Sequence, residues 1–497
     1  MTRHALGAMA LWLAAGTAWA QSADPLRTAV DNAINSNPEV SARFNAYRAA
    51  TDAVDVARAG YYPRLDAIAS VGRDEDRIGS RSPESQSLNR HAAGLSLTQL
   101  LWDGLGTRND VARSGHDRLA RYFELLDVTE QTSLEAARAH FDVQRYRRLV
   151  TLAEDNYVQH RYAFLQIQSR FKAGVGRGVD LEQAGARVAL AESNLSTEVA
   201  NLHDVTARYQ RVVGMAPPKE LPAITMLRAG VPASQADAMN AAVRQSAAIS
   251  ASIEGLRAAR SSADGRRAAY QPRVEARVRG VAGKNVDGVQ DQSRNTAAEI
   301  VLNWNLFNGG ADQARVRQQA NLMSQAADLR DKTCRDTRQT TAIAYNDTRK
   351  LVDQLVYLER NTLAIEKARD AYRQQFDIGQ RSLLDLLNAE NELYTARRAY
   401  ANAEYDLAFA YARTHAAMYQ LGAQLGVART DTGANEASGW ELGEDAPTRC
   451  PVIVAEVIET DHRELDARAQ RLARSAPQPA AAAAASVPAV PPAVRKP

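Results

Sequence analysis

The apolar residues of this chain follow two spacings, and both spacings occur in each half. After Asp385, Leu, Ala and Tyr recur alternately every three and four residues, and the same spacing follows Asp180 with one polar break. A sustained seven-residue repeat is typical of long helices in a coiled coil, where small Ala residues allow close approach. The sequence therefore predicts long antiparallel helical hairpins over 105–214 and 310–422.

The two halves repeat each other at a constant offset. FKAGVGRGVDLEQA begins at Phe171, and FDIGQRSLLDLLNA begins 205 residues later at Phe376. Gly104 and Gly309 differ by the same offset, so neither intervening span contains an insertion. Unconstrained loops would drift in length, so each span of roughly 66 residues is predicted to be one helix, about 100 Å long.

The quoted stretches are then the turns of the two hairpins. Gly174 in the first turn and Gly379 in the second relax the backbone where the chain reverses. The GVGRG sequence at Gly174 superficially suggests a phosphate-binding loop, but no strand precedes it and no GK[ST] follows it. A structural turn is therefore the favoured interpretation.

Alternation with a period of two predicts four β-strands, two before each long helix. Their expected ranges are about 64–73, 92–101, 273–282 and 297–306. In the third range Val274, Ala276 and Val278 alternate with charged residues. Segments of about ten residues with one apolar and one polar face are a weak signature of a transmembrane β-barrel, although soluble antiparallel sheets show the same alternation. The polar links between paired strands predict exposed hairpin loops.

Aromatic residues favour the membrane interpretation. They stand where the strands are expected to start or end, and these strand ends would all lie at one face of the membrane, where aromatic residues gather. The residues are Tyr61, Tyr62, Tyr270, Trp102, Trp304 and Phe307. Four strands cannot close, and open strand edges are not tolerated in lipid, so several copies must assemble. Two copies would give eight strands with a filled interior, whereas three would give twelve strands and an open lumen.

Composition and the first residues indicate the compartment. With 45% hydrophobic but only 6% aromatic residues, the 497-residue chain favours closely packed helices, and its net charge of +3 gives no reason to expect nucleic-acid binding. Residues 1–20 read as a signal peptide cleaved after Ala20, because a short apolar run precedes Ala-Trp-Ala. The Ala- and Pro-rich segment 475–497 is predicted to be disordered.

The cysteines and the missing catalytic motifs complete the residue-level picture. Cys334 and Cys450 are the only cysteines, and in an exported chain a disulfide is favoured over two free thiols. The bond would pin RCPVIVAEVIE to the outside of the helices. No histidine cluster has metal-ligand spacing and no nucleophile lies in a motif with its base, so we expect no enzyme activity, cofactor or metal site.

Taken together, these features resemble the TolC-like outer-membrane channel-tunnels over about residues 25–425. Besides the twofold repeat, the resemblance rests on the Pro-Arg strand starts at Pro63 and Pro272, the WDG and FNGG motifs at Trp102 and Phe307, and the FxxG turns at Phe171 and Phe376. It implies a mixed fold, all-α plus transmembrane β-barrel, in which a homotrimer forms a twelve-stranded barrel in outer-membrane lipid and a helical periplasmic tunnel. The implied repeats are 21–230 and 231–425, with a collar formed around PPKELPAITMLRAGVPAS and by 426–474.

The resemblance also implies a periplasmic gate at the hairpin turns. By position, Asp385 matches the first aspartate of the family's acidic rings, and Asn388 falls where the second ring has Asp. Arg381 and Asp180 match residues that help to hold the entrance closed. Phe376 replaces a tyrosine whose hydroxyl helps closure, so closure here would depend more on packing and on Arg381. Because Asn388 is neutral, the acidic rings would carry half of the usual charge.

The function implied is that of an outer-membrane exit duct in a tripartite export system. Its partners would be a periplasmic adaptor and an inner-membrane ABC or proton-driven transporter. Asn388, the paired cysteines and the long tail favour type I protein secretion, with drug efflux as the alternative. A periplasmic coiled-coil adaptor also uses long hairpins, but it would need lipoyl-like and barrel modules, which this sequence does not contain.

Overall fold

The computed structural model describes residues 24–286, 290–429, 436–454 and 460–475. The chain divides into two compact units, one ending at Val452 and the other beginning at Ile453. The expected signal peptide lies outside the described residues, as does the expected disordered tail after its first residue. That first residue, Ser475, instead ends helix α10 (His462–Ser475) of the second unit, whose residues are not buried.

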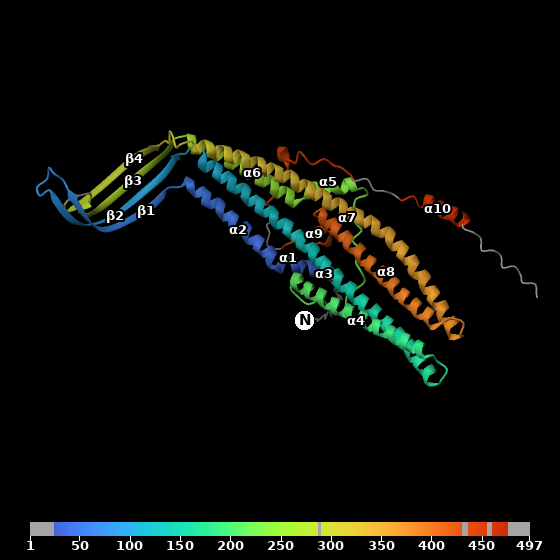
Figure 1. Ribbon diagram of the computed structural model, residues 1–497. Helices are drawn as coiled ribbons and strands as arrows, with labels where there is room; N and C mark the ends of the chain where they lie inside the picture. The colour runs from blue at the N-terminus through green and yellow to red at the C-terminus, as the bar shows by residue number, and fades with distance from the viewer. Residues whose placement is uncertain (1–23, 287–289, 430–435, 455–459, 476–497) are drawn as a thin grey trace, which may run out of the picture. The chain divides into compact units, whose positions relative to one another are not determined.

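Two helical hairpins of matching length dominate the first unit (Figure 1). Helices α3 (Gly106–Lys172) and α7 (Ala311–Asp377) contain 67 residues each. After a short turn, α4 (Gly178–Val213) packs back along α3, and α8 (Leu383–Ala417) packs back along α7. The starts of α3 and α7 are 205 residues apart, and so are their ends. The structure therefore confirms that each of the two spans of equal length is one helix.

Shorter helices cover the long ones. Helices α1 (Pro25–Ser36) and α2 (Pro38–Arg58) pack on α3, α6 (Ala247–Arg266) lies against both α3 and α7, and α5 (Gln235–Gln245) lies against α7. The five-residue α9 (Leu421–Leu425) packs on α8. The largest buried apolar cluster includes Phe141 of α3 and Leu407 of α8, so both halves share one core.

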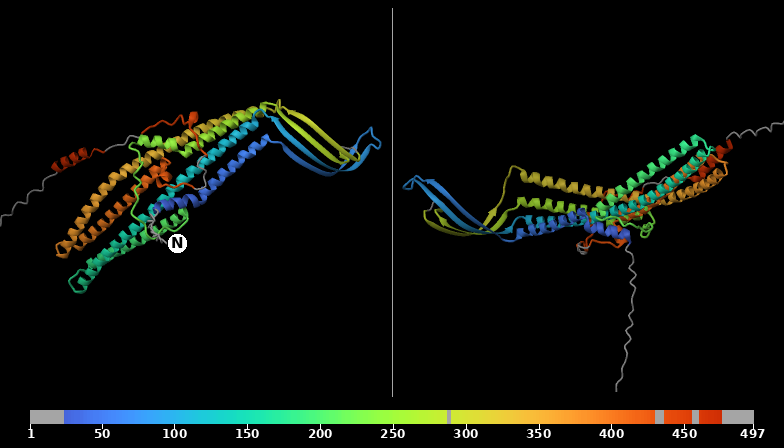
Figure 2. Two further views of the ribbon diagram at one scale, coloured as in Figure 1. Left: turned by 180° about the vertical axis from the view of Figure 1, so that it is seen from behind. Right: turned by 90° about the horizontal axis from the view of Figure 1, so that it is seen from below.

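The four strands form one antiparallel sheet in the order β1-β2-β3-β4. The strands are β1 (Arg64–Arg77), β2 (Ser85–Trp102), β3 (Arg273–Lys284) and β4 (Gln292–Asn303). Within the first unit the sheet lies at the end of the helices opposite the hairpin turns (Figures 1 and 2). Short 3₁₀ turns, η1 (Ala59–Tyr61) and η2 (Arg267–Tyr270), precede β1 and β3.

The observed strands differ from the expected ranges in two places. Strand β1 extends to Arg77 and β2 already begins at Ser85, so much of the polar link that was expected to be a loop is strand. Its polar residues pair across the strands, as where Arg73 Nε donates to Ser87 Oγ at 2.7 Å. Strand β4 spans 292–303 and not 297–306, because its pairing with β3 ends at Asn303. Polar composition thus misled the prediction, since polar cross-strand pairs also sustain a sheet.

The segment between the two repeats wraps the middle of the helices. Residues 217–234 contain no helix or strand, yet backbone carbonyls of this segment bond to helices of both repeats. Gln144 of α3 donates to one of these carbonyls at 3.0 Å, and Tyr345 of α7 donates to a second at 2.7 Å. Nε2 of His415 on α8 lies 2.9 Å from a third carbonyl of the segment. These contacts fasten the segment to helices of both repeats.

Candidate functional site

The two faces of the sheet have opposite chemistry. On one face the pairing register aligns Leu65, Leu97, Val278 and Ala298 in a row across all four strands. Apolar side chains on this face are open to the surroundings, with Leu65 66% exposed and Ile300 72% exposed. Such large exposed apolar residues on one continuous face indicate contact with an apolar environment.

Charged side chains occupy the opposite face. Glu275 accepts hydrogen bonds from Arg273 at 2.7 Å and from Arg277 at 3.3 Å, and Arg64 Nε lies 2.9 Å from Asp66 Oδ2. Arg277 is also the register partner of Glu299 on β4. The polar face is therefore suited to water. β1 and β4 are the edge strands, so each leaves one edge unpaired among the described residues.

The strand–helix junctions place the motif residues as the sequence suggested for three of the four strands. Pro63 and Pro272 directly precede β1 and β3, and Trp102 is the last residue of β2. Trp304 follows β4 and does not belong to it, which corrects the expected strand range. Phe307, expected at the junction of strand and helix, lies in the same link to α7. Trp304 Nε1 donates to the Tyr270 carbonyl at 3.2 Å, which joins the links on both sides of the second hairpin.

The two hairpin turns pack against each other through apolar side chains. Phe376 of α7 is buried, in a cluster that includes Ile167 of α3, Ala184 of α4 and Leu387 of α8. The guanidinium of Arg170 lies 5.1 Å from the centre of the Phe376 ring. Phe376 thus stabilises the approach of the two turns by packing and cation–π contact within one chain.

Arg381 and Asp385 lie together at the start of α8. Their nearest charged atoms are 3.8 Å apart, and the Arg381 guanidinium also covers the Tyr372 ring at 5.0 Å. Asp385 forms a capping box with Ser382, so its carboxylate also fixes the first turn of α8. Asp180 is half-buried in the first turn of α4, on the other hairpin. Gly174 and Gly379 occupy the turns with φ of 77° and 78°.

Asn388 is engaged by a residue that sequence reasoning missed. Its Oδ1 accepts a hydrogen bond from Arg187 of α4 at 2.8 Å, so Asn388 joins the two hairpins and is half-buried between them. The repeat gave no signal for Arg187, because no motif of the first hairpin includes it.

A second missed feature is a buried ionic cluster two residues further along α8. Glu390 is 7% exposed and accepts from Arg369 at 3.3 Å and from Arg373 at 2.6 Å, both on α7. Arg373 also donates to Gln159 of α3 at 2.6 Å. Beside it, burial lowers the pKa of His160, so this imidazole is neutral at pH 7. The sequence held one signal for this cluster, because the charged residue Glu390 directly follows Ala389 of the predicted apolar seam.

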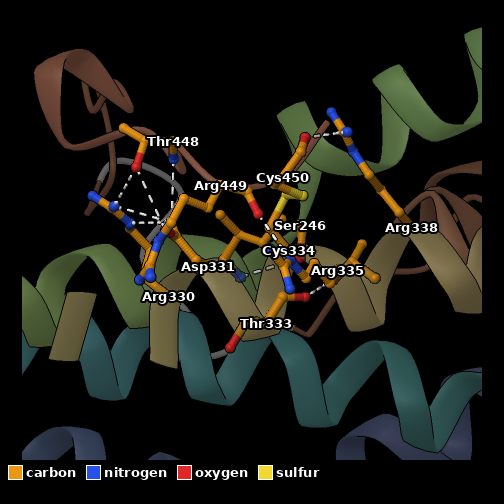
Figure 3. The surroundings of a disulfide bond; sticks show 12 residues. Ser246, Arg330, Asp331, Thr333, Cys334, Arg335, Arg338, Thr448, Arg449 and Cys450 are labelled. Carbon is orange, nitrogen blue, oxygen red and sulfur yellow. Dashed lines mark hydrogen bonds and ion pairs between the residues drawn. A yellow bond between two sulfur atoms is a disulfide. The ribbon is translucent and has the colours of Figure 1, made fainter. Parts of the chain in front are cut away.

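Cys334 and Cys450 form a disulfide, as predicted, with a Cα–Cα distance of 6.1 Å. It fastens the C-terminal segment to α7 (Figure 3). In the described residues, three or more His, Cys, Asp or Glu side chains nowhere gather as metal ligands would. None of the described helices combines the length and apolarity needed to cross a bilayer.

A twofold helical-hairpin repeat joined to a two-faced antiparallel sheet defines the class of outer-membrane channel proteins. The chain belongs to the outer membrane efflux protein family, whose sequence model matches residues 29–214 and 238–418. It is therefore a transport protein of the outer membrane and not an enzyme.

Curated relatives and solved structures agree with this assignment. The chain is 25% identical to the outer membrane efflux protein BepC of Brucella suis, over 83% of this chain and 89% of BepC. It is also 25% identical to the alkaline protease secretion protein AprF of Pseudomonas aeruginosa, over 87% of this chain and 92% of AprF. The CmeC outer membrane channel of Campylobacter jejuni shares the fold with a TM-score of 0.72 and 15% identity, over 84% of this chain and 90% of CmeC.

Proposed function

We propose that three copies of this chain form the exit duct of a tripartite export system. The observation that carries the proposal is the sheet, which has an apolar face, a charged face and two unpaired edges. Pairing β4 of one copy with β1 of the next removes those edges, and twelve strands leave an open lumen. The charged face would line the lumen and the apolar face would contact outer-membrane lipid.

The helical hairpins would continue this lumen through the periplasm and meet the other components. We expect an adaptor protein and an inner-membrane ABC or proton-driven transporter as partners. Residues 217–234 and the part of the C-terminal segment that belongs to the first unit, up to Val452, would form a collar around the helices. The collar proposal is supported by the bonds from Gln144, Tyr345 and His415 to the first of these segments.

For cargo, we favour polypeptides exported by type I secretion over small toxic molecules. The name of AprF refers to secretion of a protease, and that relative aligns over most of this chain. BepC is described as an efflux protein, so drug efflux is the second candidate. Deleting the gene in its native host distinguishes the two. Loss of a secreted polypeptide with unchanged drug susceptibility supports secretion, and increased drug susceptibility with an unchanged set of secreted proteins contradicts it.

The hairpin turns would act as the periplasmic gate, with Asp385 contributing a negative ring of one carboxylate per copy. In planar bilayers, Asp385→Asn is expected to reduce cation selectivity and block by divalent cations, because the ring loses all of its charge. The control is Asp377→Asn at the exposed last residue of α7, which matches no ring position, so it should leave both properties near the wild type. Unchanged selectivity and block in Asp385→Asn would remove Asp385 from the gate.

A further inference from the structure

The C-terminal segment 436–450, here called the clasp, is held in place by two buried carboxylates of the second repeat. Its first anchor is Glu254 of α6, which is fully buried. Trp440 Nε1 donates to Glu254 at 2.8 Å, Arg257 donates at 2.6 Å, and His116 Nδ1 of α3 lies 2.7 Å away. Arg257 also donates to Asp445 of the clasp at 2.9 Å. This anchor fixes the start of the clasp across α3 and α6.

The second anchor lies beside the disulfide (Figure 3). Asp331 of α7 is 3% exposed, and it accepts from the Thr448 backbone N–H at 3.2 Å and from Arg449 Nε at 2.9 Å. Asp331 precedes Cys334 by three residues, which is nearly one turn of α7, and Arg449 directly precedes Cys450. The ion pair therefore sets the clasp in the register that brings the two sulfur atoms together.

Arginine side chains surround the disulfide. Arg335 Nε donates to the Arg449 carbonyl at 2.9 Å, and Arg338 donates to the Cys450 carbonyl. Arg330 pairs with Asp331 at 3.0 Å on the same side. These bonds hold the clasp backbone at Arg449 and Cys450 against α7, beside Cys334. In thiol–disulfide exchange the attacking species is a thiolate.

We propose that Cys334 and Cys450 are an oxidation site for a protein of the dithiol–disulfide oxidase class, and that Asp331 is its positioning residue. The Cys450 thiolate attacks the disulfide of the oxidised partner, forming a mixed disulfide and releasing one partner sulfur. The Cys334 thiolate then attacks the Cys450 sulfur and releases the second partner sulfur. In total the chain loses two protons and two electrons, and the partner's disulfide becomes a dithiol.

The order of these steps follows from the positions of the cysteines. They are 116 residues apart, and the lower part of α7 and all of α8 lie between them. Both cysteines are buried in the folded chain, with Cys450 8% exposed and Cys334 on α7 1% exposed. Because Cys450 is the more exposed of the two and lies on the clasp, we assign the first attack to Cys450.

The full-length chain, reduced and then equilibrated in glutathione buffers, tests this role. Maleimide-polyethylene glycol would report the fraction of oxidised protein. Asp331→Asn is expected to lower the ratio of oxidised to reduced protein about tenfold or more, since a bond from Arg449 to a buried carboxylate is lost. Asp328→Asn is the matched control, because Asp328 also pairs with Arg449 but both side chains are exposed. That control should keep the wild-type ratio.

Arg449→Ala removes the same contact from the exposed side and leaves the buried face of α7 intact, so it covers the case in which Asp331→Asn fails to fold. A wild-type ratio in Arg449→Ala would overturn the positioning role. Free thiols at both cysteines in protein isolated from cell envelopes without reductant would overturn the oxidation site itself. Conductance is measured separately, so either failure is distinguishable from failure of the channel proposal.

Discussion

Replacing Glu390 by alanine is expected to lower the stability of the helical hairpins by about 1–3 kcal/mol. The substitution removes the carboxylate that Arg369 and Arg373 both contact, although Arg369 keeps its ion pair with Asp370 at 3.0 Å and the Arg373 side chain is 37% exposed. Glu390 and the side chain of Arg369 are 7% and 13% exposed, so water cannot replace that carboxylate fully. The loss should appear as a lower melting temperature of the detergent-solubilised protein, followed by circular dichroism of its helices.

The control for this prediction lies two residues further along α8. Glu392 is exposed, and Glu392→Ala should change the melting temperature little, as substitutions on solvated helix surfaces usually do. Arg373→Ala should be less damaging than Glu390→Ala, because Arg369 still neutralises Glu390. Equal melting temperatures for the Glu390 and Glu392 variants would show that the cluster does not stabilise the contact between the hairpins.

Replacing Gly104 by alanine is expected to cost about 2–5 kcal/mol, because it combines backbone strain with a steric overlap. Gly104 has a φ of +68°, a conformation that alanine adopts at a cost. An added Cβ would also lie 2.5 Å from Gln271 Cβ and 3.1 Å from Ala268 Cα. The overlap would separate the β2–α3 link from the chain leading into β3, so the junction of sheet and helices should loosen.

The internal repeat provides the control for Gly104. Gly309 has the same φ of +68°, but an added Cβ there meets nothing within 4 Å. Gly309→Ala should therefore show only the backbone strain, about 1–2 kcal/mol. Melting temperatures of both variants separate the two contributions. If Gly309→Ala is as destabilising as Gly104→Ala, packing at Gln271 does not contribute.

The helical part of the fold was predictable because its signals are long and occur twice. The interval from Gly104 to Phe171 recurs unchanged from Gly309 to Phe376, and it predicted the length of one helix, which α3 and α7 have. The strands were predicted less well. Their apolar alternation stops before Arg77, whereas the sheet continues through polar cross-strand pairs that a pattern of hydrophobicity does not record.

The site was predictable only where one residue type implied its partner. Two cysteines in an exported chain have one possible intrachain pairing, and the structure has that bond. The bond from Arg187 to Asn388 and the cluster around Glu390 depend on how α4 and α7 face α8. Helical periodicity places each residue on its own helix, but it does not specify which charged residue of a neighbouring helix will be opposite.

The central claim is that several copies close one sheet around a lumen, and electron cryomicroscopy of the detergent-extracted protein tests it most directly. We expect a threefold-symmetric particle with a continuous twelve-stranded sheet, in which β4 of each copy pairs antiparallel with β1 of the next, and with an axial cavity running on between the helices. A single chain whose β1 and β4 edges stay unpaired, with no axial cavity, would contradict the account.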